Sequence, residues 1–147
     1  MVDNTEFIYD LGVVGLGYVG LPLAVEAANC GLNVLGYDIN SERVQLINEG
    51  NSPIEDISNE ELSKSQQNLH VTTENKELSN CNNIVISVPT PLTDYQPDLS
   101  YVINAAKTVG ENLVQNQVVI LESTTYPGTT IEVLIPNLEK ISGMKAG

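Results

Sequence analysis

Three glycines near the start of the chain have the spacing of a phosphate-binding turn. Gly15, Gly17 and Gly20 follow a short apolar run in the pattern Gly-x-Gly-x-x-Gly. The first glycine of such a pattern permits a tight turn, the second lets the backbone approach a pyrophosphate, and the third lets the next helix pack close to the sheet. No Lys or Arg precedes Arg43. The attraction for a phosphate must therefore come from backbone N–H groups and from the partial positive charge at the helix N-terminus.

An acidic residue follows these glycines at the distance typical of a dinucleotide site. Asp38 lies 18 residues after Gly20, close to the roughly 20 expected for the carboxylate that binds the adenosine ribose. A carboxylate there would repel a 2′-phosphate, so the pattern favours NAD over NADP. Arg43 stands where its guanidinium could cover the adenine, reach the ribose, or simply face solvent. Alternatively, Asp38 only caps the following helix, although Asn40 and Ser41 are better candidates for that role.

The composition narrows the range of partners. A chain of 147 residues suits one domain with a substantial core. Acidic residues outnumber basic ones by 19 to 6, so nucleic acids and anionic membrane surfaces are poor candidate partners. The sequence contains no secretory signal and no apolar run near the roughly 20 residues of a membrane span. We expect a reducing, cytoplasmic location.

The cysteines and the histidine are not predicted to do chemistry. Cys30 falls at the end of the first predicted helix and Cys81 precedes a strand, and both are expected to be small, semi-buried residues. His70, the only histidine, enters a short strand and has no companion base or metal ligand nearby in the sequence. We expect it to be structural, and we predict no metal site.

Strands and helices alternate along the chain. The predicted strands are residues 9–14, 33–37, 70–72, 84–88 and 118–122, and the predicted helices are residues 18–30, 41–48, 60–68, 101–114 and 129–141, with a helical turn at 75–80. This alternation predicts an α/β fold, a Rossmann-type doubly wound parallel sheet with helices on both faces. Its ligands would bind beyond the carboxyl ends of the strands. We expect residues 1–7 to be a disordered extension and residues 8–147 to form the NAD-binding domain.

Two further segments lie at the carboxyl ends of predicted strands. Residues 88–92 read Val-Pro-Thr-Pro-Leu, in which two prolines stiffen the chain and Thr90 offers a hydroxyl. Residues 122–130 read Glu-Ser-Thr-Thr-Tyr-Pro-Gly-Thr-Thr, a dense set of hydroxyls closed by a Pro-Gly turn. An ordinary loop with a threonine N-cap would account for the second segment. Its expected position beside the glycine turn favours a functional role.

Four segments together resemble the UDP-glucose/GDP-mannose dehydrogenase family. They are residues 15–24, 36–40, 88–92 and 122–130, in this order and at these spacings. The resemblance covers nearly the whole chain. Residues 53–55, residues 97–104 and the complete 122–130 segment look most like the bacterial branch that oxidises UDP-N-acetylhexosamines, UDP-N-acetylglucosamine in particular.

The resemblance implies an activity and a set of site residues. The family oxidises the C6 hydroxyl of a nucleotide sugar through an aldehyde to a uronic acid, reducing two NAD, and so makes precursors of capsule and O-antigen polysaccharides. By motif match, the residues implied in NAD binding are Gly15, Leu16, Gly17, Tyr18, Val19, Gly20, Asp38, Arg43, Val88, Pro89, Thr90, Ser123 and Thr124. Thr124 would also support catalysis, because a hydroxyl near the nicotinamide could hydrogen-bond a catalytic water or the developing alkoxide.

The family's other catalytic groups have no counterpart in these 147 residues. Its nucleophilic cysteine, lysine, asparagine and a further acidic residue all lie downstream of the matched segments. The resemblance therefore implies that the chain is the N-terminal part of a longer enzyme, with a central helical region and a UDP-binding domain, and that it is inactive alone. The full-length enzyme would bind a UDP-sugar and form a homodimer or larger assembly.

Other interpretations stay open at this point. A dehydrogenase of the 6-phosphogluconate or hydroxyacid type shares a similar first domain, although it would be expected to carry a different loop at 122–130. A non-catalytic NAD-sensing module needs only the glycine turn and Asp38, and it leaves the hydroxyl-rich loop unexplained. A methyltransferase fits less well, because its glycine turn does not usually continue as the Tyr-Val-Gly-Leu-Pro of residues 18–22.

Overall fold

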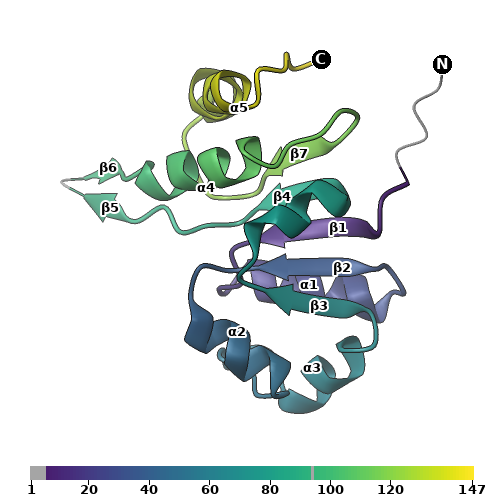
Figure 1. Ribbon diagram of the computed structural model, residues 1–147. Helices are drawn as coiled ribbons and strands as arrows, with labels where there is room; N and C mark the ends of the chain where they lie inside the picture. The colour runs from purple at the N-terminus through teal and green to yellow at the C-terminus, as the bar shows by residue number, and fades with distance from the viewer. Residues whose placement is uncertain (1–5, 94) are drawn as a thin grey trace.

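A computed structural model describes residues 6–93 and 95–147. Its main feature is a five-stranded sheet in the order β3-β2-β1-β4-β7 (Figure 1). These strands are β1 (Tyr9–Val14), β2 (Val34–Tyr37), β3 (Leu69–Thr72), β4 (Cys81–Ile86) and β7 (Val118–Leu121). Most of the predicted extension at residues 1–7 lies outside the described residues, and Glu6 and Phe7 belong to no helix or strand.

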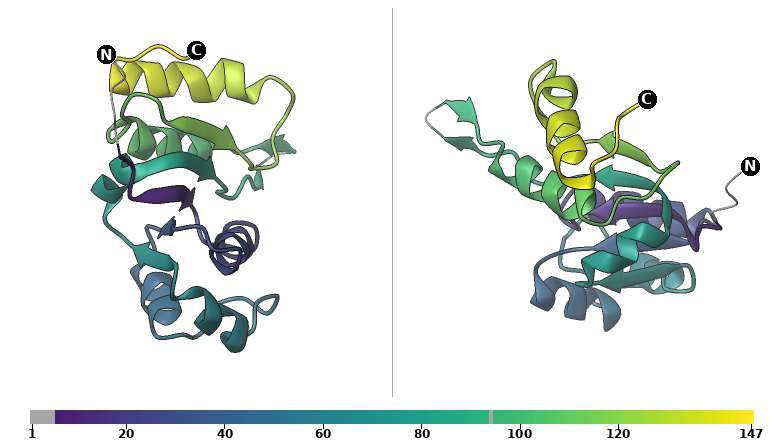
Figure 2. Two further views of the ribbon diagram at one scale, coloured as in Figure 1. Left: turned by 90° about the vertical axis from the view of Figure 1, so that its right-hand side faces the viewer. Right: turned by 45° about the horizontal axis from the view of Figure 1, so that its top comes forward.

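Helices cover both faces of the sheet (Figure 2). They are α1 (Gly20–Asn29), α2 (Ser41–Asn48), α3 (Asn59–Ser65), the 3-10 helix η1 (Asn75–Asn80), α4 (Ser100–Gly110), the π-helical turn η2 (Thr130–Leu134) and α5 (Ile135–Ser142). Neighbouring strand residues point to opposite faces. Val13 packs in a core with α1, α2 and α3, whereas Val14 packs in a second core with α4 and α5. The α/β, doubly wound fold predicted from the sequence is confirmed.

The strand order places the ends of β1 and β4 at the centre of one edge. All four strand pairs of the sheet are parallel, and Val14 is in register with Tyr37 on one side and Ile86 on the other. The segments that follow β1, β2, β4 and β7 therefore meet at the same carboxyl edge. Because the chain runs outward in opposite directions from β1, this edge is the switch point at which such folds bind ligands.

The structure differs from the sequence prediction near the site. The first helix begins at Gly20 instead of residue 18, because residues 15–19 form the turn that follows β1. The strand predicted at 84–88 spans Cys81–Ile86, which leaves residues 87–89 as a strand-end segment. The last helix opens with the π-helical turn at Thr130–Leu134.

The connection from β4 to α4 contains a feature that the sequence did not predict. Two short strands, β5 (Leu92–Thr93) and β6 (Gln96–Pro97), form an antiparallel hairpin that projects beyond the sheet (Figure 1). Tyr95 in its turn has a positive φ of 62°. Helix α4 ends at Gly110 instead of residue 114, since glycine has a low helix propensity. No helix in the described part of the chain is long and apolar enough to span a membrane.

Candidate functional site

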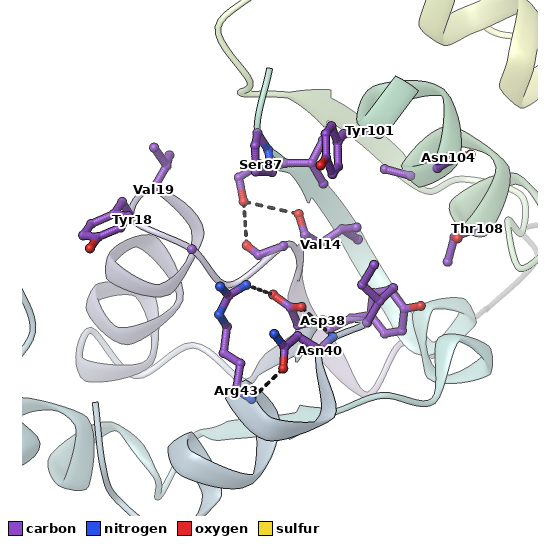
Figure 3. Close-up of a pocket in the computed structure, with 17 residues that line it drawn as sticks. Val14, Tyr18, Val19, Asp38, Asn40, Arg43, Ser87, Tyr101, Asn104 and Thr108 are labelled. Carbon is purple, nitrogen blue, oxygen red and sulfur yellow. Dashed lines mark hydrogen bonds and ion pairs between the residues drawn. The ribbon is translucent and has the colours of Figure 1, made fainter. Parts of the chain in front are cut away.

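A pocket of about 630 Å³ opens at the carboxyl edge of the sheet (Figure 3). Its walls are the turn after β1, the end of β2 with the residues that follow it (37–40), residues 87–89 after β4, and one face of α4. Of the residues that the sequence assigned to a site, the pocket is lined by Gly15, Gly17, Tyr18, Val19, Asp38, Arg43, Val88 and Pro89. The structure thus brings together most of the residues that the sequence placed in a cofactor site.

The three glycines of the turn differ in what an added side chain would meet. Gly15 has a φ of +95°, and an added β-carbon would lie 2.9 Å from the Ser87 carbonyl oxygen. At Gly20 an added β-carbon would overlap the Gly15 carbonyl oxygen, so the start of α1 packs directly on the turn. At Gly17 an added β-carbon would meet no described atom within 4 Å. Packing and backbone conformation explain the first two glycines, whereas Gly17 faces open space in the pocket.

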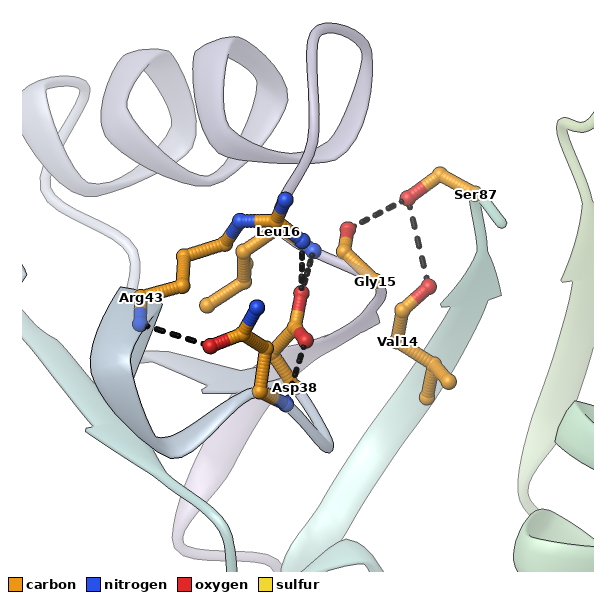
Figure 4. A network of polar contacts seen from close by, with 7 residues as sticks. Val14, Gly15, Leu16, Asp38, Arg43 and Ser87 are labelled. Atoms are coloured by element: carbon orange, nitrogen blue, oxygen red, sulfur yellow. Dashed lines mark hydrogen bonds and ion pairs between the residues drawn. The ribbon is translucent and has the colours of Figure 1, made fainter. Parts of the chain in front are cut away.

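Asp38 is nearly buried and joins β2 to the glycine turn (Figure 4). Its Oδ2 accepts hydrogen bonds from the Leu16 N–H at 2.8 Å and from Arg43 Nη1 at 3.0 Å, while its Oδ1 accepts from the Asn40 N–H at 2.9 Å. The cap of α2 is Asn40, whose Oδ1 accepts from the Arg43 N–H at 3.0 Å. The alternative that Asp38 serves only as the helix cap is therefore wrong.

Two of the predicted residues support the pocket without lining it. Leu16 has a fully buried side chain, and its backbone N–H holds the Asp38 carboxylate. Gly20 is buried at the start of α1.

Arg43 does line the pocket, where its guanidinium is paired with Asp38 and about one third exposed. Arg43 is the only basic side chain among the described residues that line this pocket.

Ser87 also lines the pocket, although the sequence did not predict it as a site residue. Its Oγ donates to the Gly15 carbonyl oxygen at 2.9 Å and also lies 3.3 Å from the Val14 carbonyl oxygen, so it fastens the end of β4 to the glycine turn. The strand predicted at 84–88 included Ser87 as an ordinary strand residue. A small polar residue at the carboxyl end of an apolar strand was the available signal.

One face of α4 was also missed. Four residues of α4 line the pocket: Tyr101, Asn104, Ala105 and Thr108. Their spacing of three, four and seven residues places them on one side of a helix.

Burial raises the pKa of the Tyr37 phenol above its ordinary value, the Asp38 carboxylate adds to the rise, and a hydrogen bond with Thr108 opposes it. Tyr37 therefore remains neutral near neutral pH.

The two hydroxyl-bearing segments lie side by side next to the pocket. Ser123 Oγ donates to the Val88 carbonyl oxygen at 2.7 Å, and Thr90 Oγ1 donates to the Thr124 carbonyl oxygen. The segment after β4 and the segment after β7 are therefore bonded to each other. Thr90, Ser123 and Thr124 are not among the residues that line the pocket. The Thr124 side chain is exposed.

The cysteines and the histidine partly differ from expectation. Cys30 is exposed, so its predicted semi-buried position is wrong, while Cys81 is buried as the first residue of β4. Burial, together with the charge of Glu77, raises the pKa of the Cys81 thiol to about 12, which keeps it protonated and unreactive. His70 does have a companion, because its Nε2 lies 3.2 Å from Glu77 Oε2 and its ring stacks on Tyr9.

Comparison with known proteins identifies what this arrangement resembles. The model of the UDP-glucose/GDP-mannose dehydrogenase family, NAD binding domain, matches residues 9–146. The chain is 42% identical over 135 residues to a UDP-N-acetyl-D-glucosamine 6-dehydrogenase of Salmonella typhi, covering 91% of this chain and 31% of that protein. It is 41% identical over 140 residues to a UDP-N-acetyl-D-mannosamine dehydrogenase of Pyrococcus horikoshii, covering 93% and 33%.

Solved structures give the same result. A ternary complex of GDP-mannose dehydrogenase from Pseudomonas aeruginosa superposes with a TM-score of 0.88 at 32% identity, covering 94% of this chain and 34% of that one. A UDP-N-acetyl-mannosamine dehydrogenase from Staphylococcus aureus superposes with a TM-score of 0.80 at 31% identity, covering 92% and 34%. The chain spans about a third of the length of these relatives.

Proposed function

Because the chain belongs to the UDP-glucose/GDP-mannose dehydrogenase family, we propose that it is the cofactor-binding part of an NAD-dependent UDP-sugar 6-dehydrogenase. The proposed reaction converts the C6 alcohol of the sugar to a carboxylate, which removes two hydrides and adds the oxygen of one water. Each hydride reduces one NAD. A UDP-N-acetylhexosamine, UDP-N-acetylglucosamine first, is the proposed substrate, because relatives named for UDP-N-acetyl-D-glucosamine and UDP-N-acetyl-D-mannosamine match at 42% and 41% identity.

The observation that carries the proposal is that Gly17 and Asp38 share one pocket. At Gly17 the position that a β-carbon would occupy is open, with no described atom within 4 Å, which suits close approach by a pyrophosphate at the start of α1. Asp38 presents a carboxylate at the end of β2, the position that hydrogen-bonds an adenosine ribose. Its negative charge in a nearly buried position disfavours a 2′-phosphate, so the residues fit NAD better than NADP.

The hydrogen bonds of Asp38 suggest what Arg43 does when NAD binds. An ionised carboxylate can accept about four hydrogen bonds, and three of them are made to Leu16, Asn40 and Arg43. A ribose brings two hydroxyl donors. The two backbone N–H groups are fixed by the fold, whereas the Arg43 side chain is partly exposed and can rotate. In the proposal, Arg43 releases Asp38 to the ribose and moves over the adenine.

The nicotinamide half is proposed to lie where the segments after β4 and β7 meet. Val88 and Pro89 line that end of the pocket, and Ser123 and Thr90 hold the two segments together. NAD supplies the hydride acceptor when bound. In the described part of the chain the Thr124 hydroxyl makes no hydrogen bond, which leaves it free to bind a water or the developing alkoxide. In the proposal, the whole protein is as long as its relatives, and its nucleophile and UDP site lie outside these 147 residues.

The other interpretations fit less well. A diketoreductase superposes with a TM-score of 0.60 at 18% identity, which shows a shared fold alone. A sensing module would not need the bonded segments at residues 88–90 and 122–124. The proposal extends to a cytoplasmic homodimer or larger assembly, without nucleic-acid or membrane partners, that makes precursors of capsule or O-antigen polysaccharides. A relative named CapL from Staphylococcus aureus is 37% identical.

The test is NADH production by the intact gene product with each of four sugars: UDP-N-acetylglucosamine, UDP-N-acetylmannosamine, UDP-glucose and GDP-mannose. Two NADH per molecule of one sugar would establish the reaction and the substrate. The 147-residue chain alone is expected to produce none. Tight NAD binding by the intact protein without turnover of any sugar would favour a sensing module, and absence of NAD binding would overturn the proposal.

A further inference from the structure

The α4 face of the pocket carries an amide without a partner. Asn104 lines the pocket on the same helix face as Ala105 and Thr108, across from the residues that follow β2 (Figure 3). Within the part of the chain that the structure describes, its side chain takes part in no hydrogen bond. Both the carbonyl acceptor and the NH₂ donor of Asn104 are therefore available to a ligand.

Two other polar side chains of the pocket already bond within the fold. Asn40 Oδ1 caps α2, and Ser87 Oγ is bonded to the carbonyl oxygen of Gly15. The Thr108 hydroxyl is close enough to the Tyr37 phenol to lower the pKa of that phenol. Of the two amides among the described residues that line the pocket, Asn104 is the one whose donor and acceptor both make no hydrogen bond.

The surroundings of Asn104 suit a flat aromatic base. Ala105 is buried and small, and Ile39, which also lines the pocket, is 80% exposed. An adenosine whose ribose is held at Asp38 must place its base in the same pocket, between α4 and the end of β2. Such a base would bury exposed apolar surface of Ile39.

On the basis of the proposed NAD site, we propose that Asn104 recognises the adenine base and so determines which dinucleotide the pocket accepts. The amide carbonyl accepts a hydrogen bond from the exocyclic amine of adenine, and the amide NH₂ donates to a neighbouring ring nitrogen. Asparagine pairs with adenine in this two-bond manner in other recognition sites. The role goes beyond NAD-against-NADP selection, which depends on Asp38.

The experiment compares NAD with 1,N6-etheno-NAD, in which a two-carbon bridge ties up the exocyclic amine and the adjacent ring nitrogen. Dissociation constants are measured by calorimetry for the intact protein and for two variants. Asn104→Leu keeps a side chain of similar shape without its hydrogen bonds, so any steric effect of the bridge persists. Lys107→Leu, at an exposed position of the same helix, is the matched control.

The unmodified protein is expected to bind NAD roughly 5- to 100-fold more tightly than the etheno compound. Asn104→Leu is expected to reduce that ratio to about threefold or less, mainly by weakening NAD, and Lys107→Leu is expected to keep it. An unchanged ratio in Asn104→Leu would overturn the role of Asn104 while leaving NAD binding intact. Failure of the unmodified protein to bind NAD at all would overturn the proposed function as well.

Discussion

The two sides of the carboxyl edge are built in contrasting ways. Around β1 and β2 the glycine turn is bonded to Asp38, and each residue of β2 is buried. After β7 the loop at 122–130 is largely exposed, and β7 itself exposes 51% of Val118 and 42% of Ile120. In the proposed NAD site, the adenosine half lies against the closely bonded turn and Asp38. The proposed nicotinamide half lies against two loops that are bonded to each other but are more exposed.

The largest expected effect is a loss of stability at Gly20, a glycine that the fold requires. Gly20→Ala should lower the free energy of unfolding by about 3 kcal/mol or more, because the new methyl group overlaps the Gly15 carbonyl oxygen and crowds Ser87. Urea unfolding followed by circular dichroism measures the change.

Gly17→Ala is the matched variant within the same turn. Its methyl group meets no described atom and its φ is not positive, so stability should change by less than about 1 kcal/mol. NAD binding should weaken roughly tenfold, about 1.4 kcal/mol. Unchanged NAD affinity in folded Gly17→Ala would show that the pyrophosphate does not contact this turn.

The next largest effect concerns Asp38. Asp38→Ala should weaken NAD binding by about 1 to 3 kcal/mol, since a charged hydrogen bond to the ribose is lost. It should also lower the free energy of unfolding by about 1 to 3 kcal/mol, because the Leu16 N–H then has no acceptor. Calorimetric titration with NAD and urea unfolding give the two quantities. A variant that loses stability but binds NAD normally would contradict the assignment of the ribose site.

The same contrast explains which features the sequence predicted. The turn at residues 15–20 and the acid at 38 are local patterns with fixed chemistry, so their meeting at one edge followed from the alternation of strands and helices. Asn40 as the cap of α2 followed from side-chain chemistry alone. The order of the five strands confirms the doubly wound topology inferred from that alternation.

The features that the sequence did not predict depend on tertiary contacts. Ser87 bonds to a carbonyl oxygen 72 residues away, and no local pattern encodes that partner. The pocket face of α4 has helical spacing, but the spacing alone does not separate a pocket wall from a core face. The π-helical start at Thr130 and the hairpin with Tyr95 at positive φ depend on backbone conformations that composition does not specify.

A smaller effect should appear only in turnover. Thr124→Ala in the intact protein is expected to raise the activation barrier by about 1 to 2 kcal/mol, which lowers kcat roughly 5- to 30-fold, because the hydroxyl is proposed to bond the reacting oxygen or its water. NAD affinity and stability should stay within about twofold and about 0.5 kcal/mol of the unmodified protein, because Thr124 is exposed. Steady-state NADH production and calorimetry make the measurement. Equal losses in kcat and NAD affinity would instead place Thr124 in binding.

The smallest effects test whether the two sides differ in rigidity. Ser87 and Ser123 each donate to a backbone carbonyl oxygen beyond a strand end, but Ser87 is buried and Ser123 is half-buried. A buried acceptor that loses its donor is costlier than one that water can reach. Ser87→Ala should therefore lower the free energy of unfolding by about 1 to 1.5 kcal/mol, and Ser123→Ala by about 0.5 kcal/mol. Hydrogen exchange should increase at the glycine turn in the first variant and around residues 88–90 in the second. Equal destabilisation by both substitutions would mean that the loop after β7 is held as firmly as the turn after β1.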